Sequence, residues 1–177
     1  MKASVYIGTS LDDFIARSNG DIDWLEQYAN EEAVEAYHVF IKNIDVILIG
    51  RGTFEKVLSF PTWPYDKKVF VLSTTLNELP EALQEKVSIL SMNPPKLLDH
   101  LSRLGFSSVY VDGGKVIQSF LREDLIDVLI ISKVPVLIGR GLPLFGELNM
   151  DLQFKHVKTI VQSNQLVRSY YERDRPR

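Results

Sequence analysis

The sequence contains no cysteine, and this absence removes several kinds of chemistry at once. Disulfides, thiolate metal sites and cysteine nucleophiles are all excluded for this chain. The three histidines, His38, His100 and His156, are scattered without the spacing of ligands, so we expect no transition-metal site. A chain without cysteine also fits a reducing compartment, and we expect a cytoplasmic protein.

Long apolar runs and a basic stripe are missing as well. No run approaches the roughly 18 apolar residues of a membrane helix, and Asp12 and Asp13 interrupt the first apolar stretch too early for a signal peptide. The formal net charge is −3, whereas duplex-binding proteins usually carry a concentrated basic surface. We therefore expect neither a membrane nor a nucleic-acid partner, and an anionic ligand would have to be held by a few placed groups.

What the chain does have is a regular alternation of two hydrophobic periods over 177 residues, the length of one ordinary domain. Short apolar runs predict strands at 4–7, 14–16 (a short partner of the first), 45–49, 68–72, 87–90, 108–111 and 126–132. A 3.6-residue period predicts helices at 32–42, 53–58, 94–104 and 115–121, and the segments 154–162 and 166–171 read as a hairpin. The whole predicts one α/β domain over residues 1–177, with a mostly parallel sheet flanked by helices and a C-terminal antiparallel hairpin at one edge.

Three of the expected buried strands are followed by turns rich in glycine or hydroxyl groups. These turns are Gly50-Arg51-Gly52-Thr53, Ser73-Thr74-Thr75 and Asp112-Gly113-Gly114-Lys115. Glycine lets a ligand approach the backbone, a helix start offers free N–H groups, and an arginine fork suits a phosphate. Strand-to-helix turns also use glycine and caps for geometry alone. Because parallel strands end at the same edge of a sheet, the three turns together predict a dinucleotide lying across that edge.

Aspartates and tryptophans near the other turns leave two interpretations open. Asp12 and Asp13 follow the first strand and are either turn residues or part of a substrate site. Trp24 and Trp63 are expected to pack in the core or a lid rather than form a wall against a flat ring.

Five segments, in this order and spacing, resemble the dihydrofolate-reductase-like superfamily. They are SLDDFIA, DVILIGRGTFE, KVFVLSTT, VYVDGGKVIQSFL and VPVLIGRGLPLFG, and they span nearly the whole chain. The resemblance is strongest to the reductase domain of bacterial riboflavin biosynthesis and its stand-alone relatives. It implies an NADPH-dependent reductase, acting on a small heterocyclic substrate such as a ribosylamino-pyrimidine.

The resemblance also implies roles for individual residues. Gly50, Arg51 and Thr53 would contact the adenosine-side phosphates, and Ser73 and Thr74 the region of the 2′-phosphate and pyrophosphate. The pyrophosphate would lie on the helix start formed by Gly113, Gly114, Lys115, Val116 and Ile117. The nicotinamide would be lined by Ile7, Gly8, Ile15 and Ala16, and Asp12 would face the substrate.

Two departures from the family pattern concern the substrate. Asp13 stands where these proteins usually have glycine, and Asp112 stands where the riboflavin enzymes have glutamate. The zinc deaminase half of the bifunctional enzymes is absent from this cysteine-free chain. Two alternatives remain: a non-catalytic NADP-binding domain, and, with less support, a dihydrofolate reductase.

The resemblance also points to a homodimer. The apolar segment 134–139 and the following Pro143-Leu144-Phe145 would otherwise form an exposed sheet edge, so we expect two copies to pair there.

Overall fold

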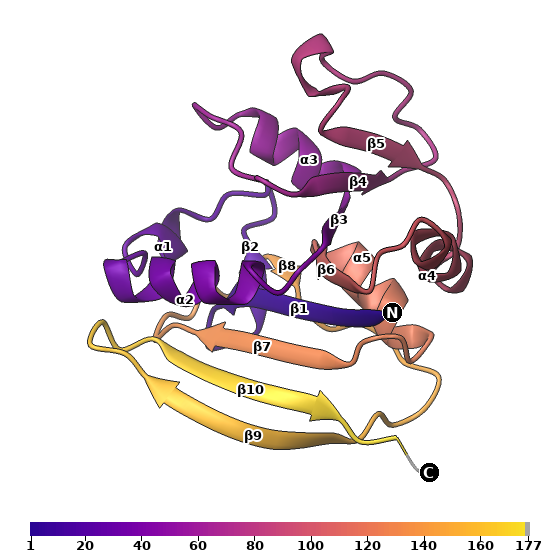
Figure 1. The fold of residues 1–177 in the computed structure, drawn as a ribbon. Coiled ribbons are helices and arrows are strands. Elements are labelled where there is room, and N and C mark those ends of the chain that lie inside the picture. Colours follow the sequence, from indigo (N-terminus) through magenta and orange to yellow (C-terminus); the bar gives the residue numbers. More distant parts are fainter. Residues whose placement is uncertain (176–177) are drawn as a thin grey trace.

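The structure, a computed structural model that describes residues 1–175, is built on an eight-stranded sheet (Figure 1). In spatial order the strands are β5 (Val87–Leu90), β4 (Lys68–Leu72), β3 (Val46–Gly50), β6 (Ser108–Asp112), β1 (Lys2–Thr9), β7 (Val128–Lys133), β10 (Val167–Arg173) and β9 (Phe154–Val161). The first six run parallel, and the hairpin β9–β10 closes one edge in the antiparallel sense. The expected dihydrofolate-reductase-like α/β architecture is confirmed, including the hairpin at the edge.

Helices cover both faces of this sheet, and four of them lie where the sequence predicts them. They are α2 (Glu31–Ile41), α3 (Arg51–Leu58), α4 (Pro94–Arg103) and α5 (Gly114–Arg122); a short α1 (Asp23–Glu26) and a 3₁₀ turn (Glu81–Leu83) complete the set. The helix α1 was not expected, since four residues are too few for a helical period to appear. On α2, Tyr37 and Ile41 pack inward, whereas Val34, at the same helical period, is 46% exposed, so the apolar face of this helix is narrow.

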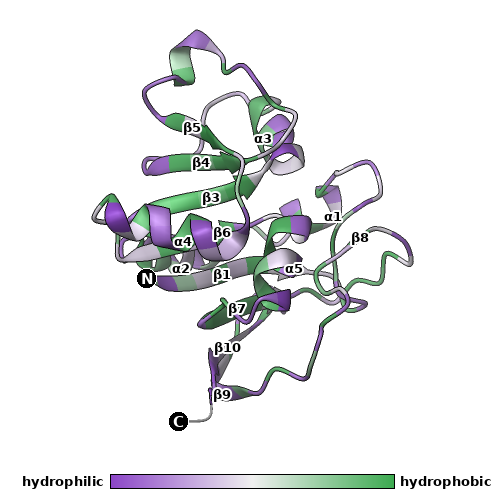
Figure 2. Cartoon of the chain, turned by 90° about the vertical axis from the view of Figure 1, so that its right-hand side faces the viewer, coloured by the Kyte–Doolittle hydropathy of each residue, from purple (hydrophilic) through white to green (hydrophobic). Residues whose placement is uncertain are grey.

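Alternate residues of the buried strands point into two separate cores. On β3, Val46 and Leu48 pack with α4 and α5, whereas Ile47 and Ile49 pack with α3 and the inner side chains of α2. Figure 2 shows β3 and β4 coloured as apolar along most of their length. A strand buried on both faces needs apolar residues at every position, which explains the continuous run DVILI.

The short strand β2 (Phe14–Ala16) has a different partner from the one expected. It pairs with β8 (Leu142–Pro143) in a small second sheet, not with β1. Both edges of β1 are already occupied by β6 and β7, so no edge remains for it. The consequence is that the loop before β8 lies against the loop after β1, at the carboxyl end of the large sheet.

The segment 134–139 forms no strand and no sheet edge, which corrects the reasoning behind the expected dimer. Val134 and Leu144 are fully buried, although Leu137 remains 71% exposed. The sheet ends at β5 on one side and at β9 on the other, and the residues of β9 from Lys155 onward are all exposed.

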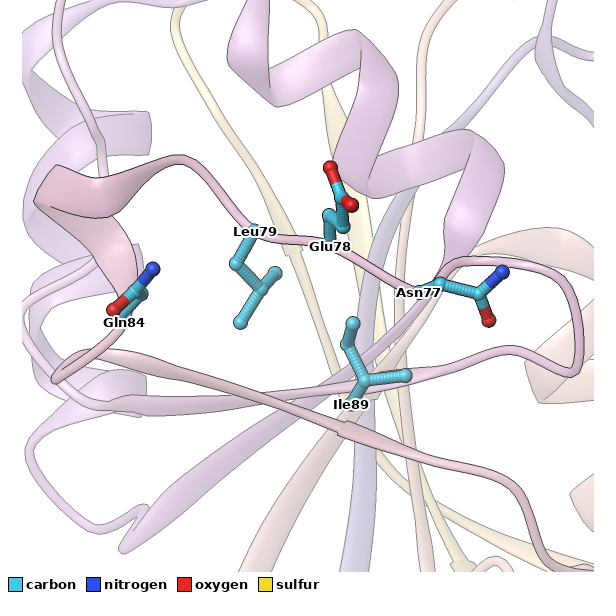
Figure 3. A pocket seen from close by; sticks show the side chains of 5 residues that line it. All are labelled: Asn77, Glu78, Leu79, Gln84 and Ile89. Atoms are coloured by element: carbon cyan, nitrogen blue, oxygen red, sulfur yellow. The ribbon is translucent and has the colours of Figure 1, made fainter.

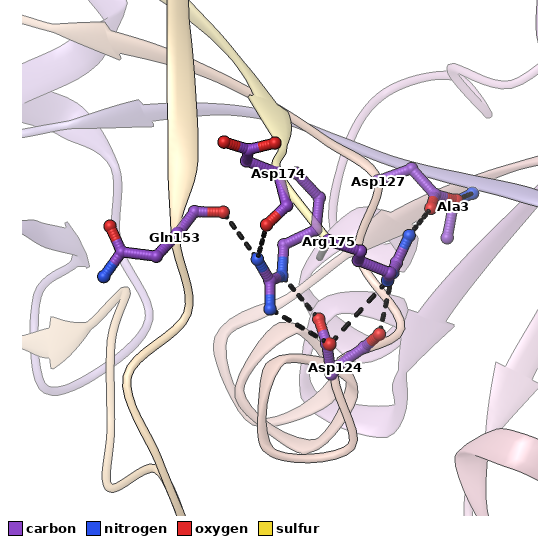
Figure 4. Close-up of polar contacts among 7 residues, drawn as sticks. Ala3, Asp124, Asp127, Gln153, Asp174 and Arg175 are labelled. Atoms are coloured by element: carbon purple, nitrogen blue, oxygen red, sulfur yellow. Dashed lines mark hydrogen bonds and ion pairs between the residues drawn. The ribbon is translucent and has the colours of Figure 1, made fainter. Parts of the chain in front are cut away.

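Ion pairs connect the C-terminal end of β10 to the loop that precedes β7 (Figure 4). Arg173 contacts Asp124 at 2.6 Å, and Arg175 contacts Asp127 at 2.6 Å. The second oxygen of Asp127 accepts the backbone N–H of Ala3 at 2.8 Å. This network joins β10, β7 and β1 at the end of the sheet away from the carboxyl ends of the parallel strands.

No helix in the described part of the chain is long and apolar enough to cross a membrane.

Candidate functional site

A large cleft runs along the carboxyl ends of β5, β4, β3, β6 and β1. Its volume is about 1280 Å³, above the roughly 300–1,000 Å³ of a typical single-ligand pocket. All but two of the residues that the resemblance assigns to a site line it: Ile7, Gly8, Ile15, Ala16, Gly50, Arg51, Thr53, Ser73, Thr74, Gly113, Gly114, Lys115 and Val116. The exceptions are Asp12 and Ile117. The five strand ends therefore gather these groups as a parallel sheet should.

Ile117 belongs to the core and not to the cleft. Its side chain is fully buried among the residues beneath α5, and its N–H donates to the Gly113 carbonyl at 2.9 Å within the helix. Neither its side chain nor its backbone donor is available to a ligand. The resemblance assigned Ile117 to the pyrophosphate site, but its side chain lies on the inward face of α5 and belongs to the core.

Two of the helices that meet the cleft begin without a side-chain cap. Gly50 is the N-cap of α3 and Gly113 that of α5, and neither can cap its helix with a side chain. By contrast, Asn30 and Asn93 cap α2 and α4 with their side-chain oxygens. Thr53, where the sequence predicts the start of this helix, lies in its first turn instead, because the helix starts at Arg51. The uncapped N–H groups and the dipole of both helices are thus open to an anion.

Gly113 occupies a position that no other residue fits without a shift. Its φ is +91°, and a Cβ built there would lie 2.5 Å from the Thr53 hydroxyl oxygen. A Cβ on Gly114 would meet Ile15 Cδ1 at 3.0 Å. The glycine pair therefore brings the start of α5 against both α3 and β2, and keeps the backbone bare at the cleft.

Arg51 lies at the outer rim of the cleft. Its guanidinium donates to the Thr75 hydroxyl at 2.9 Å and faces Glu55 at 3.4 Å, and the side chain is about half exposed. The Ser73 hydroxyl in turn accepts the N–H groups of Thr75 and Leu76, so the turn after β4 is held in place. A guanidinium beside hydroxyls and helix N–H groups forms a setting for a phosphate.

The sequence missed the turn after β5. Ser91, Met92, Asn93 and Pro94 all line the cleft, next to the turn after β4. The signal was present, since Val87–Leu90 was expected as a strand and a polar turn with an N-cap follows it. Applying the same rule to every strand end would have found it.

On the α3 side of the sheet, the cleft is lined by aromatic rings around one carboxyl group. We call this the aromatic half, formed by Tyr6, Ile22, Leu25, Lys56, Phe60, Tyr65, Tyr110 and Asp112; the cofactor half comprises the turns after β3, β4 and β5 with the start of α5. Phe40 stacks on Tyr6 at 4.9 Å between ring centroids and meets Tyr110 edge-on at 5.2 Å. These contacts hold the rings of Tyr6 and Tyr110 in place from behind.

Asp112 is the single carboxylate among the cleft-lining residues that the structure describes. Burial raises its pKa to about 6, and the Gly113 N–H, at 2.7 Å, and the Tyr110 hydroxyl partly offset that effect. The negative charge of Asp112 adds to burial in raising the pKa of Tyr65 and of Tyr110. A carboxyl group with a pKa near neutrality can hold or release a proton under ordinary conditions.

The Asp12 side chain binds the loop that precedes β8 and does not line the cleft. Its carboxylate accepts the Ser10 hydroxyl at 2.6 Å and the N–H groups of Ile138 at 3.3 Å and Gly139 at 2.8 Å. These donors, the Ser10 hydroxyl first, lower the pKa of Asp12. The next residue, Asp13, has a φ of 61°, the left-handed conformation in which the family's usual glycine is at ease. Asp12 is thus a clamp between the loop after β1 and the loop before β8.

A buried arginine lies behind the aromatic half. Arg168 of β10 is 2% exposed, donates to the Ser132 hydroxyl at 2.9 Å, and places its guanidinium 5.3 Å from the centre of the Tyr6 ring. Its positive charge opposes the effect of burial, which raises the pKa of Tyr6 to about 12. No sequence pattern pointed to Arg168, because it stands in an ordinary alternating strand. Trp24 and Trp63 pack in the cores, as expected.

A second hollow, of about 400 Å³, lies beside β5 and differs in chemistry from the cleft (Figure 3). Its walls are Asn77, Glu78, Leu79, Gln84 and Ile89. It has no cation, no glycine and no aromatic ring, so it offers little to an anion or a flat heterocycle. Among residues 1–175, no three histidine, aspartate or glutamate side chains are grouped to hold a metal ion.

The comparison that decides the family is a match over residues 3–167 to the model of the RibD C-terminal domain. The chain belongs to this family. A solved structure described as a putative riboflavin biosynthesis protein from Shewanella sp. PV-4 is 41% identical, with a TM-score of 0.93, and the match covers 99% of this chain and 100% of that one.

Two more distant structures share the fold. The diaminohydroxyphosphoribosylaminopyrimidine deaminase/5-amino-6-(5-phosphoribosylamino)uracil reductase of Thermotoga maritima is 18% identical with a TM-score of 0.74; 98% of this chain matches 56% of that longer one. A dihydrofolate reductase from Enterococcus faecalis, in complex with NADP(H), is 15% identical with a TM-score of 0.71, over 98% of this chain and 97% of that one. The RibD-type reductase domain resembles dihydrofolate reductase in its fold, as the sequence led us to expect.

Proposed function

We propose that this RibD-type domain is an NADPH-dependent reductase that transfers a hydride to a small heterocyclic substrate. The observation that carries the proposal is the cleft itself, which is larger than one ligand needs and joins two chemically different halves. One half offers glycine turns, hydroxyls and uncapped helix starts, and the other offers rings and a carboxyl group. A dinucleotide fits the first and a flat heterocycle the second.

The described residues fit the cofactor in chemistry and in shape. The bare backbone at Gly113 and Gly114 and the uncapped N–H groups of α5 would hold the pyrophosphate. Arg51, with Ser73 and Thr74 beside it, would hold the phosphates of the adenosine end. Ile7, Gly8, Ile15 and Ala16 would line the nicotinamide. The Enterococcus faecalis dihydrofolate reductase, which shares the fold, was solved with NADP(H), and this supports the choice of cofactor.

The chemistry divides between cofactor and protein. When bound, the reduced nicotinamide supplies the hydride. The aromatic side chains that line this half, Tyr6, Phe60 and Tyr65, would limit how a flat substrate lies and exclude water from it. Asp112 is our candidate for the group that holds a proton beside the substrate, because it lines the cleft and has a pKa of about 6. Asp12 supports the site by fixing the loop before β8, and is proposed to position rather than contact the substrate.

The cofactor assignment is tested by thermal denaturation with and without NADPH. A ligand at about 100 times its dissociation constant should add roughly 2.7 kcal/mol to the free energy of unfolding, so the melting temperature should rise clearly. An unchanged melting temperature at millimolar NADPH would refute the assignment. Stabilisation without turnover of any pterin, folate or amino-pyrimidine would instead favour the non-catalytic alternative.

We also propose that the protein is a homodimer in the cytoplasm, now with β9 as the pairing edge. The strand is open along its length and carries the exposed apolar side chains Val157 and Val161. Light scattering should give about twice the 20.2 kDa of one chain. A mass of one chain at micromolar concentration would refute the dimer.

A further inference from the structure

The distribution of positive charge along the cleft is uneven in a way that bears on the substrate. Three cations line the cleft: Arg51, Lys56 and Lys115. Arg51 and Lys115 stand at the starts of α3 and α5, in the cofactor half. Only Lys56 stands in the aromatic half, among the described residues. A phosphate on the substrate would therefore depend on this one side chain.

Lys56 is already engaged by a carboxylate of the same chain. Its ammonium lies 2.7 Å from Asp21, and Asn19 donates to the other oxygen of Asp21 at 2.7 Å. The hydrogen bond from Lys56, followed by that from Asn19, lowers the pKa of Asp21, so the carboxylate is ionised near neutral pH. The charge of Lys56 is thus balanced where a substrate phosphate would need it. The buried Arg168 cannot replace it, since it does not line the cleft and its guanidinium is engaged by the Ser132 hydroxyl and the Tyr6 ring.

The remaining groups of the aromatic half suit a neutral ring with N–H donors. Tyr6, Tyr65 and Tyr110 contribute ring atoms to its lining, and Asp112 offers a carboxylate among them. A carboxylate has about four lone-pair positions, and the Gly113 N–H accounts for only part of that capacity, while the Tyr110 hydroxyl donates to the Tyr6 carbonyl at 2.9 Å. An amino-substituted nitrogen heterocycle presents adjacent N–H groups, which can donate hydrogen bonds to a carboxylate. A phosphate near Asp112 would instead be repelled by the carboxylate charge.

We propose that the substrate of this reductase is an unphosphorylated, amino-substituted nitrogen heterocycle that lies in the aromatic half of the cleft and donates to Asp112. The inference rests on the proposed reductase function and deepens it. It separates this chain from the Thermotoga maritima enzyme, whose substrate by name carries a phosphoribosyl group. The pair Lys56–Asp21 is the specificity element, because it neutralises the one cation that a phosphoryl group would use.

The test compares two ligands that differ only in the phosphate. The probes are 5-amino-6-(5-phosphoribosylamino)uracil and its dephosphorylated form, titrated calorimetrically into wild-type protein saturated with NADPH, with NADPH consumption measured in parallel. We expect the dephosphorylated compound to bind at least about tenfold more tightly, the effect of one charge-assisted interaction. Tighter binding of the phosphorylated compound, or binding of neither, overturns the inference.

Two variants make the test independent of folding. Asp21→Asn removes a partly exposed ion pair that adds little to stability, frees Lys56, and should raise affinity for the phosphorylated compound about tenfold. Asp112→Asn should weaken both heterocycles by a similar factor and leave the dissociation constant of NADPH unchanged. If Asp21→Asn binds the phosphorylated compound no better than wild type, Lys56 is not the element that we describe. If NADPH fails to bind the wild type, the proposed function fails instead, and the two outcomes are distinct.

Discussion

The two halves of the cleft are built from the same sheet edge but by different means. The cofactor half is made of backbone: glycine turns and helix starts, with side chains such as Arg51 only at its rim. The aromatic half is made of side chains held from behind by a second layer of rings and by the buried Arg168. Backbone recognition tolerates changes of side chain but not of conformation, whereas the aromatic half can change its ligand by single substitutions. The comparison predicts where variants of this family keep their cofactor and where they alter their substrate.

The largest effect is expected from Gly113→Ala, which changes the backbone of the cofactor half. The new Cβ must adopt a left-handed φ and would lie 2.5 Å from the Thr53 hydroxyl oxygen. The strain of about 1–2 kcal/mol and the displaced turn should weaken NADPH binding about a hundredfold or more, as measured by fluorescence titration. Gly105→Ala is the matched control, because Gly105 has the same φ of +91° with no atom within 4 Å of its Cβ. It should lower stability by the strain alone and leave NADPH binding intact; equal loss of binding in both would place the pyrophosphate elsewhere.

The second effect concerns the aromatic half and depends on pH. Asp112→Asn should lower kcat on a reducible heterocycle about a hundredfold, the lower end for a group that transfers a proton. Because burial raises the pKa of Asp112 from 3.8 to about 6, the contribution of Asp112 to stability is greatest below pH 4 and declines as the pH rises through 6. The neutral variant lacks that decline, so it should melt higher than wild type at pH 8 and equally at pH 4.

Asp45→Asn serves as the control with the opposite sign. The N–H groups and hydroxyls of Ser107 and Ser108 lower the pKa of Asp45 to about 2, far from the cleft. This carboxylate stabilises the fold above pH 4 and loses that effect as the pH falls toward 2. The variant should therefore melt lower than wild type at pH 8 and keep full turnover. A higher melting temperature for Asp112→Asn at pH 4 as well would mean that its effect is packing and not charge.

A third prediction separates the rim from the backbone of the cofactor half. Arg51→Ala should weaken NADPH about tenfold while leaving NADH unchanged, if the guanidinium meets the 2′-phosphate. The effect is set at the lower end of a charge-assisted bond because Arg51 is half exposed and also faces Glu55. Arg103→Ala, which removes a similar helix pair with Asp99 outside the cleft, should change neither affinity. Equal weakening of NADPH and NADH would place Arg51 on the shared pyrophosphate.

The residues that line the cofactor half were predicted from the sequence far better than those of the aromatic half, and the reason is physical. A turn after a strand is a local feature, so the glycine and hydroxyl residues near Gly50 and Gly113 can be recognised directly in the sequence. Tyr6, Tyr65 and Arg168 come from three distant segments and gather around Asp112 only because of the strand order. Nothing local distinguishes a tyrosine that lines a cleft from one in a core. The same limit explains Ile117, where the face of the helix and not its position in the sequence decides.

The smallest effect, and the one that joins the two halves, is expected from Asp12→Asn. The sequence suggested that this side chain faces the substrate, but its carboxylate is occupied by the Ser10 hydroxyl and the N–H groups of Ile138 and Gly139. An asparagine oxygen can keep part of this set, and its NH₂ group would face a backbone N–H, so the loop before β8 should loosen. Since Leu142 and Pro143 line the cleft, the Michaelis constants for both ligands should rise modestly and kcat should fall little. The donors lower the pKa of Asp12, so wild type gains stability from it above pH 4 and loses that gain on acidification. The melting temperature of the variant should therefore lie below wild type at pH 7 and approach it at pH 3. A large loss of kcat with unchanged melting temperature would return Asp12 to the substrate, and steady-state kinetics together with a pH series of melting curves distinguish the two roles.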